Sequence, residues 1–498
     1  MRTTIIVTLT LIAVAVHFAN GSPAGANAYL FFTVLLLSFS IYSQGMRQQN
    51  YWLSLTGLVE AWFIFDYCFY GTALSVLQRS KTPLPGSMDE AYSSTYLVGG
   101  LAFLAFACGA HIGFARSRLS RGARGAALAL IAAIRARRHT FRRERLQRAV
   151  FLFFTLAGVL SVVVLLLDPE SRHQLFYEHV GLSPREGMGR YTSLFFMLPT
   201  TAVGLWYLSK PKPRRSRVLT MAGLFLIAAV HLGCGRRLMW AGTMLLVLHL
   251  LKVRGIFKLR ARYLAVALPL VLLVSLWIEA TKNTGWYEAA DAIDIGALTD
   301  GDKVFNMVDN SVGRFDTTAA LIANRESLPY YYGETFLMAP LQVLPVSAGF
   351  ERSRGVREEL GELIYGAFDR GLVSQEASLV GELYANFSYF GVLAGFLIVG
   401  FGAAFLDGRC HHNRHPIVAL GYGLCLFRAV HQLATASTSW FPLTFLAFVP
   451  WLCAIAVAQV PQERKGARVR AAIQDRTSRD CGGAAGHRFA RVPQRSRP

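Results

Sequence analysis

Residues 374–409 read SQEASLVGELYANFSYFGVLAGFLIVGFGAAFLDGR, and the second half of this stretch is almost entirely apolar. A helix that crosses a bilayer needs roughly 20 predominantly apolar residues. We therefore expect a membrane-spanning helix over 387–406. Gly391 and Gly395 form a G-x-x-x-G step inside it, which predicts close helix packing.

Similar apolar blocks recur along the whole chain of 498 residues, of which 53% are hydrophobic and 16% charged. This composition predicts an all-α polytopic membrane protein with about twelve transmembrane helices. The first block also fits a signal peptide, because small residues follow it, but we favour a retained helix. The expected spans lie near 3–19, 27–43, 52–78, 94–115, 149–167, 191–208, 217–234, 238–252, 262–279, 387–406, 416–432 and 441–459.

The formal net charge of +21 is unevenly distributed. Residues 116–148 hold eleven Arg against one Glu, whereas 280–376 holds eight Lys or Arg against fifteen acids. In a strictly alternating twelve-helix arrangement these segments fall on opposite sides, and positive loops mark the cytoplasmic side. The basicity therefore indicates membrane topology, and we expect no nucleic-acid partner.

This alternation places both termini in the cytoplasm and leaves one large external loop. The loop carries an amphipathic helical pattern over 304–322, and a second short helix is expected over 357–368. The expected units are helices one to four (1–115), a basic cytoplasmic loop (116–148), helices five to nine (149–279), the external loop (280–386), helices ten to twelve (387–459) and a basic, disordered cytoplasmic tail (460–498).

Arg236 and Arg237 lie in HLGCGRRLMWAG (231–242), at the external turn between the seventh and eighth predicted helices. Arginine is disfavoured in external loops and costly inside a membrane. Either the two side chains extend to lipid headgroups, or they form an anion site. Two guanidiniums on a tight turn suit a diphosphate, which they bind through paired, charge-assisted hydrogen bonds.

Other charged residues on the external side are also candidates. Arg314 belongs to the predicted loop helix beside Asp316, so an ion pair is the alternative to an anion-binding role. Arg428 and His431 are three residues apart near the external end of the eleventh helix, which places them on one helical face. Ionisable residues within a span indicate function.

Acidic residues supply candidates for a general base, and Asp66 of the third helix is a charge that needs a partner. Any single acid is more often structural than catalytic. The base candidates among the acids are Asp316, Glu334, Glu376 and Glu382.

Taken together, GRR (235–237), VGRFDTTAALI (312–322), YYYGETFLMAPLQVLP (330–345) and GELYANFSYFGVLAGF (381–396) resemble the O-antigen polymerases, the oligosaccharide repeat-unit polymerases of bacterial envelopes. The resemblance covers roughly residues 190–450. Ser388 stands where the family pattern has Gly.

The resemblance implies a GT-C-like fold and a metal-independent inverting glycosyltransferase without a cofactor. Such an enzyme joins saccharide repeats carried on undecaprenyl diphosphate into O-antigen, capsular or exopolysaccharide at the outer face of the bacterial cytoplasmic membrane. Its expected partners are the lipid-linked substrate, membrane lipids, a flippase and a chain-length regulator.

The chemistry assigns roles to the candidate residues. Charge builds on the diphosphate leaving group, and fixed guanidiniums neutralise it; Arg236, Arg237, Arg314 and Arg428 are the expected ligands. We expect His431 to be the general base, because its ordinary pKa of about 6.5 suits proton removal near neutral pH. Glu334, Glu376 and Glu382 are the alternatives. An O-antigen ligase-like transferase and a flippase or exporter of lipid-linked glycans are the alternative functions.

Overall fold

The computed structural model describes residues 53–122, 200–207, 237–255, 314–341, 356–365 and 377–458, apart from a few positions inside these ranges, together with residues 152, 218 and 223. All regular secondary structure in this part of the chain is helical, as expected. The predicted spans at 3–19, 27–43, 149–167 and 262–279 lie outside the described residues, apart from residue 152.

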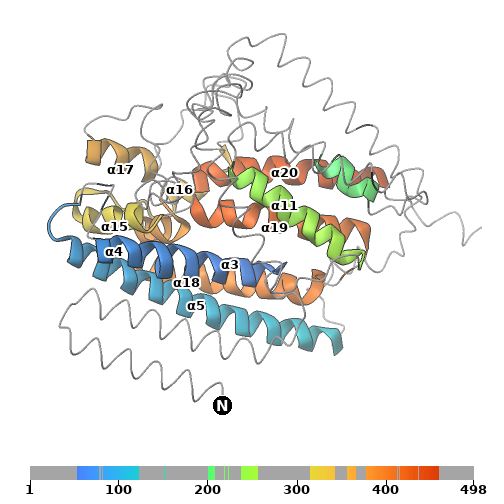
Figure 1. Ribbon diagram of the computed structural model, residues 1–498, viewed down its shortest axis with the longest axis horizontal. Helices are drawn as coiled ribbons and strands as arrows, with labels where there is room; N and C mark the ends of the chain where they lie inside the picture. The colour runs from blue at the N-terminus through green and yellow to red at the C-terminus, as the bar shows by residue number, and fades with distance from the viewer. Residues whose placement is uncertain are drawn as a thin grey trace, which may run out of the picture.

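The described helices include most of the remaining predicted spans, the predicted loop helix near 357–368 and the last part of the one predicted over 304–322, whose residues 304–313 lie outside the described residues (Figure 1). Residues 200–207 are also helical. In chain order the elements are α3 (Leu55–Phe63), the π-helical η2 (Ile64–Gly71), α4 (Thr72–Leu77), α5 (Met88–Gly122), α11 (Arg237–Val253), α15 (Phe315–Ala323), the 3₁₀ turn η5 (Arg325–Ser327), α16 (Glu334–Met338), α17 (Val356–Tyr365), α18 (Leu379–Cys410), α19 (Pro416–Ala434) and α20 (Ser437–Ala458).

Within the described residues, three helices are long and apolar enough to cross a membrane: Met88–Ser117, Leu379–Cys410 and Ile417–Ala434. Ala241–Val253 is a shorter apolar helix. Local signals explain where two of the long helices begin. Ser378 caps α18 by accepting a hydrogen bond from the Gly381 N–H at 3.2 Å, and α19 starts with Pro416, which suits a first helical turn because the N–H it lacks would have no partner there.

Helices α5 and α18 run parallel and are in close contact. A Cβ atom added to Gly109 would overlap the Leu397 carbonyl oxygen, and one added to Gly400 would overlap the Phe106 carbonyl oxygen. Farther along, Gly408 meets Ser117 in the same register. Glycine at these positions therefore lets the two backbones approach closely.

Helices α11 and α19 instead run antiparallel. Gly242 lies against the Phe427 backbone and Gly423 against Leu246. His249 Nε2 is 3.0 Å from the Ala419 carbonyl oxygen. From one contact to the next, the residue number rises in α11 and falls in α19, so the start of α11 lies level with the end of α19.

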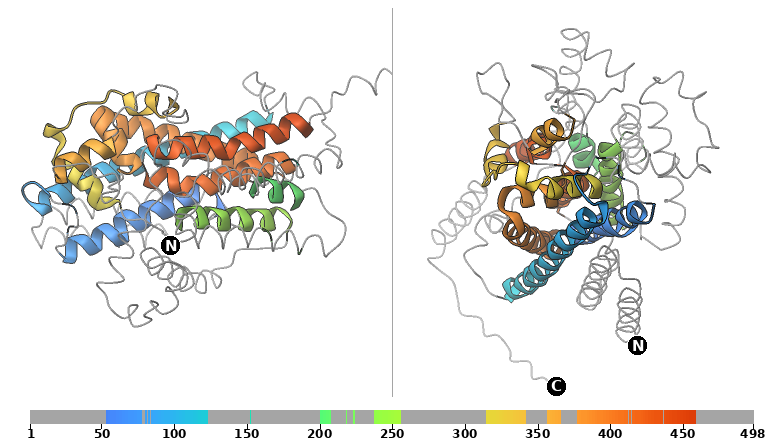
Figure 2. Two further views of the ribbon diagram at one scale, coloured as in Figure 1. Left: turned by 90° about the horizontal axis from the view of Figure 1, so that it is seen from above. Right: turned by 90° about the vertical axis from the view of Figure 1, so that its left-hand side faces the viewer.

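These directions give the bundle two distinct ends. At one end, which we call the arginine end, α4 and α19 finish and α5, α11, α18 and α20 begin; the loop helices α15 and α16 lie there (Figure 1). At the opposite end, called the Asp407 end, α3 and α19 begin and α11 and α18 finish. The view from above shows α18, α19 and α20 running between the two ends (Figure 2). The described parts of the segments predicted to be external lie at the arginine end, while the sidedness of this end stays a prediction.

Helix α18 begins before the predicted residue 387 and is sharply kinked. Phe387 (φ −141°, ψ 18°) and Ser388 (φ 53°, ψ −147°) leave the helical conformation. The first half bends back, so Gly391 faces the Leu383 backbone and Gly395 the Leu383 side chain. The close packing predicted at the G-x-x-x-G step is therefore present, and it is formed across the kink against the first half of α18.

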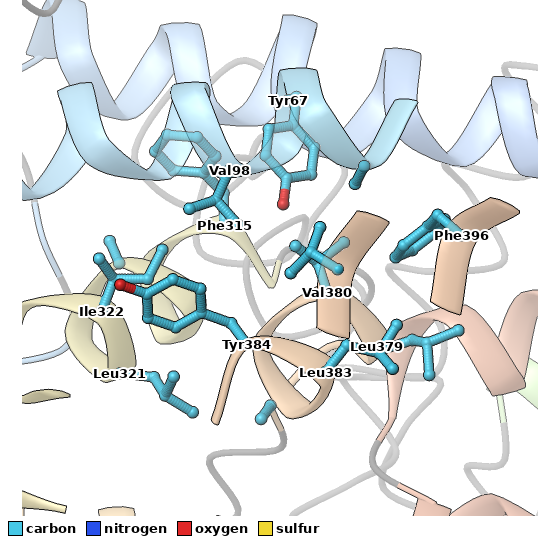
Figure 3. Close-up of a cluster of buried hydrophobic side chains, with 14 of the residues drawn as sticks. Tyr67, Val98, Phe315, Leu321, Ile322, Leu379, Val380, Leu383, Tyr384 and Phe396 are labelled. Carbon is cyan, nitrogen blue, oxygen red and sulfur yellow. The ribbon is translucent and has the colours of Figure 1, made fainter. Parts of the chain in front are cut away.

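Loop helix α15 is anchored in the hydrophobic core between α5, η2 and α18 (Figure 3). The Phe315 ring is fully buried, with its centroid 5.4 Å from that of Tyr67, 5.3 Å from Tyr92 and 4.7 Å from Tyr96. A buried aromatic ring makes a large contribution to packing. This ring fixes the start of the external-loop helix against the bundle.

Candidate functional site

The start of α15 is held by a carboxylate from a distant part of the sequence. Asp66 Oδ1 accepts hydrogen bonds from the backbone N–H groups of Arg314 at 2.7 Å and Phe315 at 3.2 Å. The first N–H groups of a helix need such acceptors, and a negative charge suits the positive end of the helix dipole. Asp66, whose partner the sequence did not indicate, thereby fixes the position of Arg314.

The Arg314 side chain reaches the end of α19. Its Nε donates a hydrogen bond to the Ala434 carbonyl oxygen at 2.9 Å. Carbonyls in the last turn of a helix have no partner within the helix, and a cation there is favoured by the helix dipole. This bond brings a predicted anion ligand of the loop to the helix that carries Arg428 and His431.

Asp316, by contrast, faces away from that pairing. It accepts hydrogen bonds from Ser80 Oγ at 2.7 Å, the Thr82 N–H at 2.8 Å and Tyr92 Oη at 3.4 Å. The carboxylate therefore joins the segment between α4 and α5 to α15. This geometry gives Asp316 a structural role.

Arg428 and His431 are in contact, as their spacing predicts. Arg428 is 1% exposed, and its Nη2 lies 3.1 Å from His431 Nδ1. Its Nε donates to Thr444 Oγ1 of α20 at 3.4 Å. Buried polar groups of this kind fix the packing of neighbouring helices, because an unsatisfied partner is costly. The Arg428 side chain therefore joins α19 to α20.

The contact with Arg428 determines the tautomer of His431. A guanidinium can only donate, so Nδ1 of the imidazole accepts and carries no proton. Thr435 Oγ1 lies 3.2 Å from Nδ1, but it donates its hydrogen to the His431 carbonyl oxygen at 2.7 Å. In the neutral ring the proton is consequently on Nε2, which is a hydrogen-bond donor.

Glu382 lies at the same end and is fully buried. Its Oε2 accepts from the Ser437 N–H at 2.6 Å, and its Oε1 accepts from the Ser437 hydroxyl at 2.5 Å. The carboxylate thus caps the start of α20. Glu334, the first residue of α16, is exposed, and the next residue, Thr335, accepts a hydrogen bond from the Ser437 hydroxyl through its carbonyl oxygen at 3.2 Å.

The remaining predicted site residues are placed only in part. Arg237 is the first residue of α11, and the antiparallel register with α19 puts its backbone level with His431. Arg236 and Glu376 lie outside the described residues. The structure thus brings Arg314, Arg428, His431, Glu334 and Glu382 to the arginine end, at the level where α11 begins.

The sequence did not indicate the buried polar network at the opposite end. Asp407 is 3% exposed and accepts hydrogen bonds from the N–H groups of Leu55 and Thr56, each at 3.0 Å. Tyr422 donates its hydroxyl to the same carboxylate at 2.5 Å. In the sequence, DGRCHHNRH (407–415) resembles a polar loop. Asp407 is its first residue, and nothing near it in the sequence indicates that it is buried.

A scan against protein-family models matches no family, and searches of curated proteins and of solved structures return no match.

Proposed function

We propose that this protein is a membrane-embedded glycosyltransferase that polymerises saccharide repeats carried on undecaprenyl diphosphate, with its active site at the arginine end. The observation that carries the proposal is that Arg314, Arg428 and His431 all lie at the end of α19. One residue comes from the external loop and two come from a span. A lipid-linked diphosphate has its charge at this depth, where the span ends and the loop begins.

The chemistry of the proposed reaction needs cations at this depth. When the attacking sugar hydroxyl displaces the diphosphate, negative charge increases on the leaving oxygen. Guanidiniums held in place by hydrogen bonds, as Arg314 and Arg428 are, stabilise that charge without having to reorganise. Arg236 and Arg237 precede and begin α11 and would complete the diphosphate site.

Within this proposal the geometry favours a donor role for His431. A proton taken up on Nδ1 would face the Arg428 guanidinium, which is 3.1 Å away. The Nε2–H group, in contrast, suits a phosphate oxygen. We therefore assign the diphosphate to His431 Nε2 and the base role to Glu334, whose exposed carboxylate is accessible to a sugar hydroxyl.

The decisive experiment uses purified protein in lipid nanodiscs with a single saccharide repeat on undecaprenyl diphosphate. We expect polymer and free undecaprenyl diphosphate. Arg314→Lys and Arg428→Lys should each reduce turnover by about tenfold or more, because Lys lacks the planar guanidinium. Arg254→Lys is the matched control, since Arg254 Nη2 donates to the Tyr207 carbonyl oxygen toward the Asp407 end, and it should retain normal turnover.

The same purified protein, reconstituted either in nanodiscs with a different lipid acceptor or in closed vesicles, separates the alternative functions. Transfer of the repeat only to a different lipid acceptor would indicate a ligase. Movement of the intact lipid-linked repeat across a vesicle bilayer, without any new glycosidic bond, would indicate a flippase or exporter. Either result would replace the polymerase proposal.

A further inference from the structure

The loop segment 330–341 exposes large apolar side chains. Tyr332 is 75% exposed and Leu337 is 76% exposed. On the adjacent kink of α18, Phe390 is 76% exposed. Large apolar side chains that gather on a surface mark an interaction site. Two further features indicate what the segment contacts: its level relative to the ends of the spans, and the exposed apolar side chains of α18 beside it.

Hydrogen bonds hold this segment level with the ends of the spans. Asn386 of α18 accepts from the Gly333 N–H at 2.8 Å and donates its amide to Thr335 Oγ1 at 2.9 Å. The Thr335 carbonyl oxygen accepts from Ser437, the first residue of α20, at 3.2 Å. The predicted span 441–459 begins about one helical turn after Ser437, so α16 lies level with the predicted boundary between lipid and water.

Exposed apolar side chains of α18 lie next to the turn that precedes α16. Gly333 lies against the Phe387 ring, 2.9 Å from the place of a Cβ atom. Beyond the kink, the outer face of α18 exposes Leu393 at 38%, Leu397 at 41% and Ile398 at 67%. That face belongs to a candidate membrane span. The exposed surface of α16 therefore lies next to the lipid-suited face of α18, on the side of the arginine end.

The turn that presents Tyr332 is held in a fixed shape. Tyr332 has φ 45° and Gly333 has φ 91°, and a bulky side chain rarely adopts such a backbone conformation unless its surroundings impose it. Tyr331, the preceding residue, is buried and donates its hydroxyl to Glu359 Oε2 of α17 at 2.5 Å. Burial and the neighbouring Glu359 raise the pKa of Tyr331 well above its ordinary value, so this donor keeps its proton.

We propose that Tyr332 and Leu337 insert into the headgroup region of the lipid leaflet at the arginine end, so that α16 rests on the membrane. Tyrosine is enriched at this depth because its ring is apolar and its hydroxyl is polar. The exposed carboxylate of Glu334, one turn from Leu337, limits the insertion to the interface. The partner is the bilayer itself, independent of any saccharide chemistry.

Fluorine NMR on the full-length protein in nanodiscs tests the proposal. Trifluoromethyl-phenylalanine is introduced at Tyr332 or at Leu337 in separate samples. Ile398 serves as the lipid-facing control and Glu326, an exposed residue of η5, as the aqueous control. Each sample receives lipid spin-labelled near the headgroup, lipid spin-labelled deep in the acyl chain, or a water-soluble gadolinium chelate, and the loss of fluorine signal is measured.

We expect the signals at 332 and 337 to be lost with the headgroup-proximal spin label and largely retained with the chelate. The control at 326 should behave in the opposite way, and the control at 398 should respond most to a label deep in the acyl chain. If the signal at either 332 or 337 survives the lipid label and disappears with the chelate, the segment faces water and the proposal is overturned. A surface used to bind saccharide would give that second pattern.

Discussion

The two ends of the bundle both bury charged side chains, but these side chains have different partners. At the Asp407 end, the charge is a carboxylate that accepts hydrogen bonds from two backbone N–H groups and from Tyr422. Lys252 and His411 are in contact beside it, and His411 Nδ1 is 3.1 Å from the Tyr422 oxygen. Helices α3, α11, α18 and α19 are joined through these groups.

At the arginine end both carboxylates and arginines join loop to span, since Asp66 holds the start of α15 and two arginines contact α19 and α20. Arg314 donates to a helix-terminal carbonyl and Arg428 donates to a threonine hydroxyl. The carboxylate Glu382 caps a separate helix. An anion held by fixed donors suits a structural joint, whereas a group of cations at the end of a span suits an anionic ligand. We therefore expect changes at Asp407 to act on stability, and changes at the arginines to act on the proposed binding of the diphosphate.

Asp407→Ala should give the largest effect and should act on stability alone. It removes the acceptor for the N–H groups of Leu55 and Thr56 and for the Tyr422 hydroxyl. Loss of one partner from a buried charged network costs about 3–5 kcal/mol. Thermal unfolding in detergent, followed by size-exclusion chromatography, measures this loss.

Two variants serve as controls for that experiment. Asp407→Asn keeps an acceptor oxygen and should lose less stability than the Ala variant, and Tyr422→Phe removes one donor and should cost about 1 kcal/mol. All folded variants should keep normal turnover per molecule. An Asp407→Ala protein as stable as the wild type would break the comparison.

The second prediction separates the two roles of His431. Gln has an amide N–H at nearly the position of Nε2–H, so His431→Gln should stay within about tenfold of wild-type turnover if the ring is a donor. His431→Leu removes the donor and should lose about 10²-fold or more. Polymer formation per folded molecule is the measurement. If Gln is as inactive as Leu, His431 is the general base expected from the sequence.

Some features were predictable because they depend on local physics. A spanning helix needs only a sufficiently long apolar run, and the predicted helix over 357–368 appears as α17. The spacing of Arg428 and His431 places both on one face of any helix, and their side chains are in contact. In each case a few consecutive residues contain the whole signal.

Other features depend on residues far apart in the chain. Asp407 and Leu55 are separated by 352 positions, and nothing near either residue indicates the hydrogen bond. The acids Asp66 and Glu382 cap helices of other segments, so each carboxylate gave no local sign of its partner. The G-x-x-x-G step predicts close approach but not which surface approaches, and here it is the helix's own first half.

The third prediction tests whether Glu382 belongs to structure or to catalysis at the arginine end. Glu382→Gln weakens two charge-assisted hydrogen bonds with Ser437 and should cost about 2 kcal/mol of stability. Turnover per folded molecule should stay near normal. Ser437→Ala is the matched control, and the double variant should cost less than the sum of the two singles, because they share one contact. Wild-type stability combined with lost turnover would instead identify Glu382 as the base.

The smallest effect is expected at the kink of α18, where Ser388→Gly should stabilise the arginine end. Ser388 has φ 53° and ψ −147°, a region that only glycine enters readily, and the strain is about 1–3 kcal/mol. Glycine also increases the conformational entropy of the unfolded chain, which offsets about 0.5–1 kcal/mol of this stabilisation.

The control is Ser388→Ala. The Ser388 hydroxyl is hydrogen-bonded to Tyr384, and both the Gly and the Ala variants remove that bond, but the Ala variant keeps the Cβ atom. The Gly variant should therefore be about 1 kcal/mol more stable than the Ala variant, measured by thermal unfolding, with unchanged turnover in both. A Gly variant no more stable than the Ala variant would show that the kink at Ser388 carries no backbone strain.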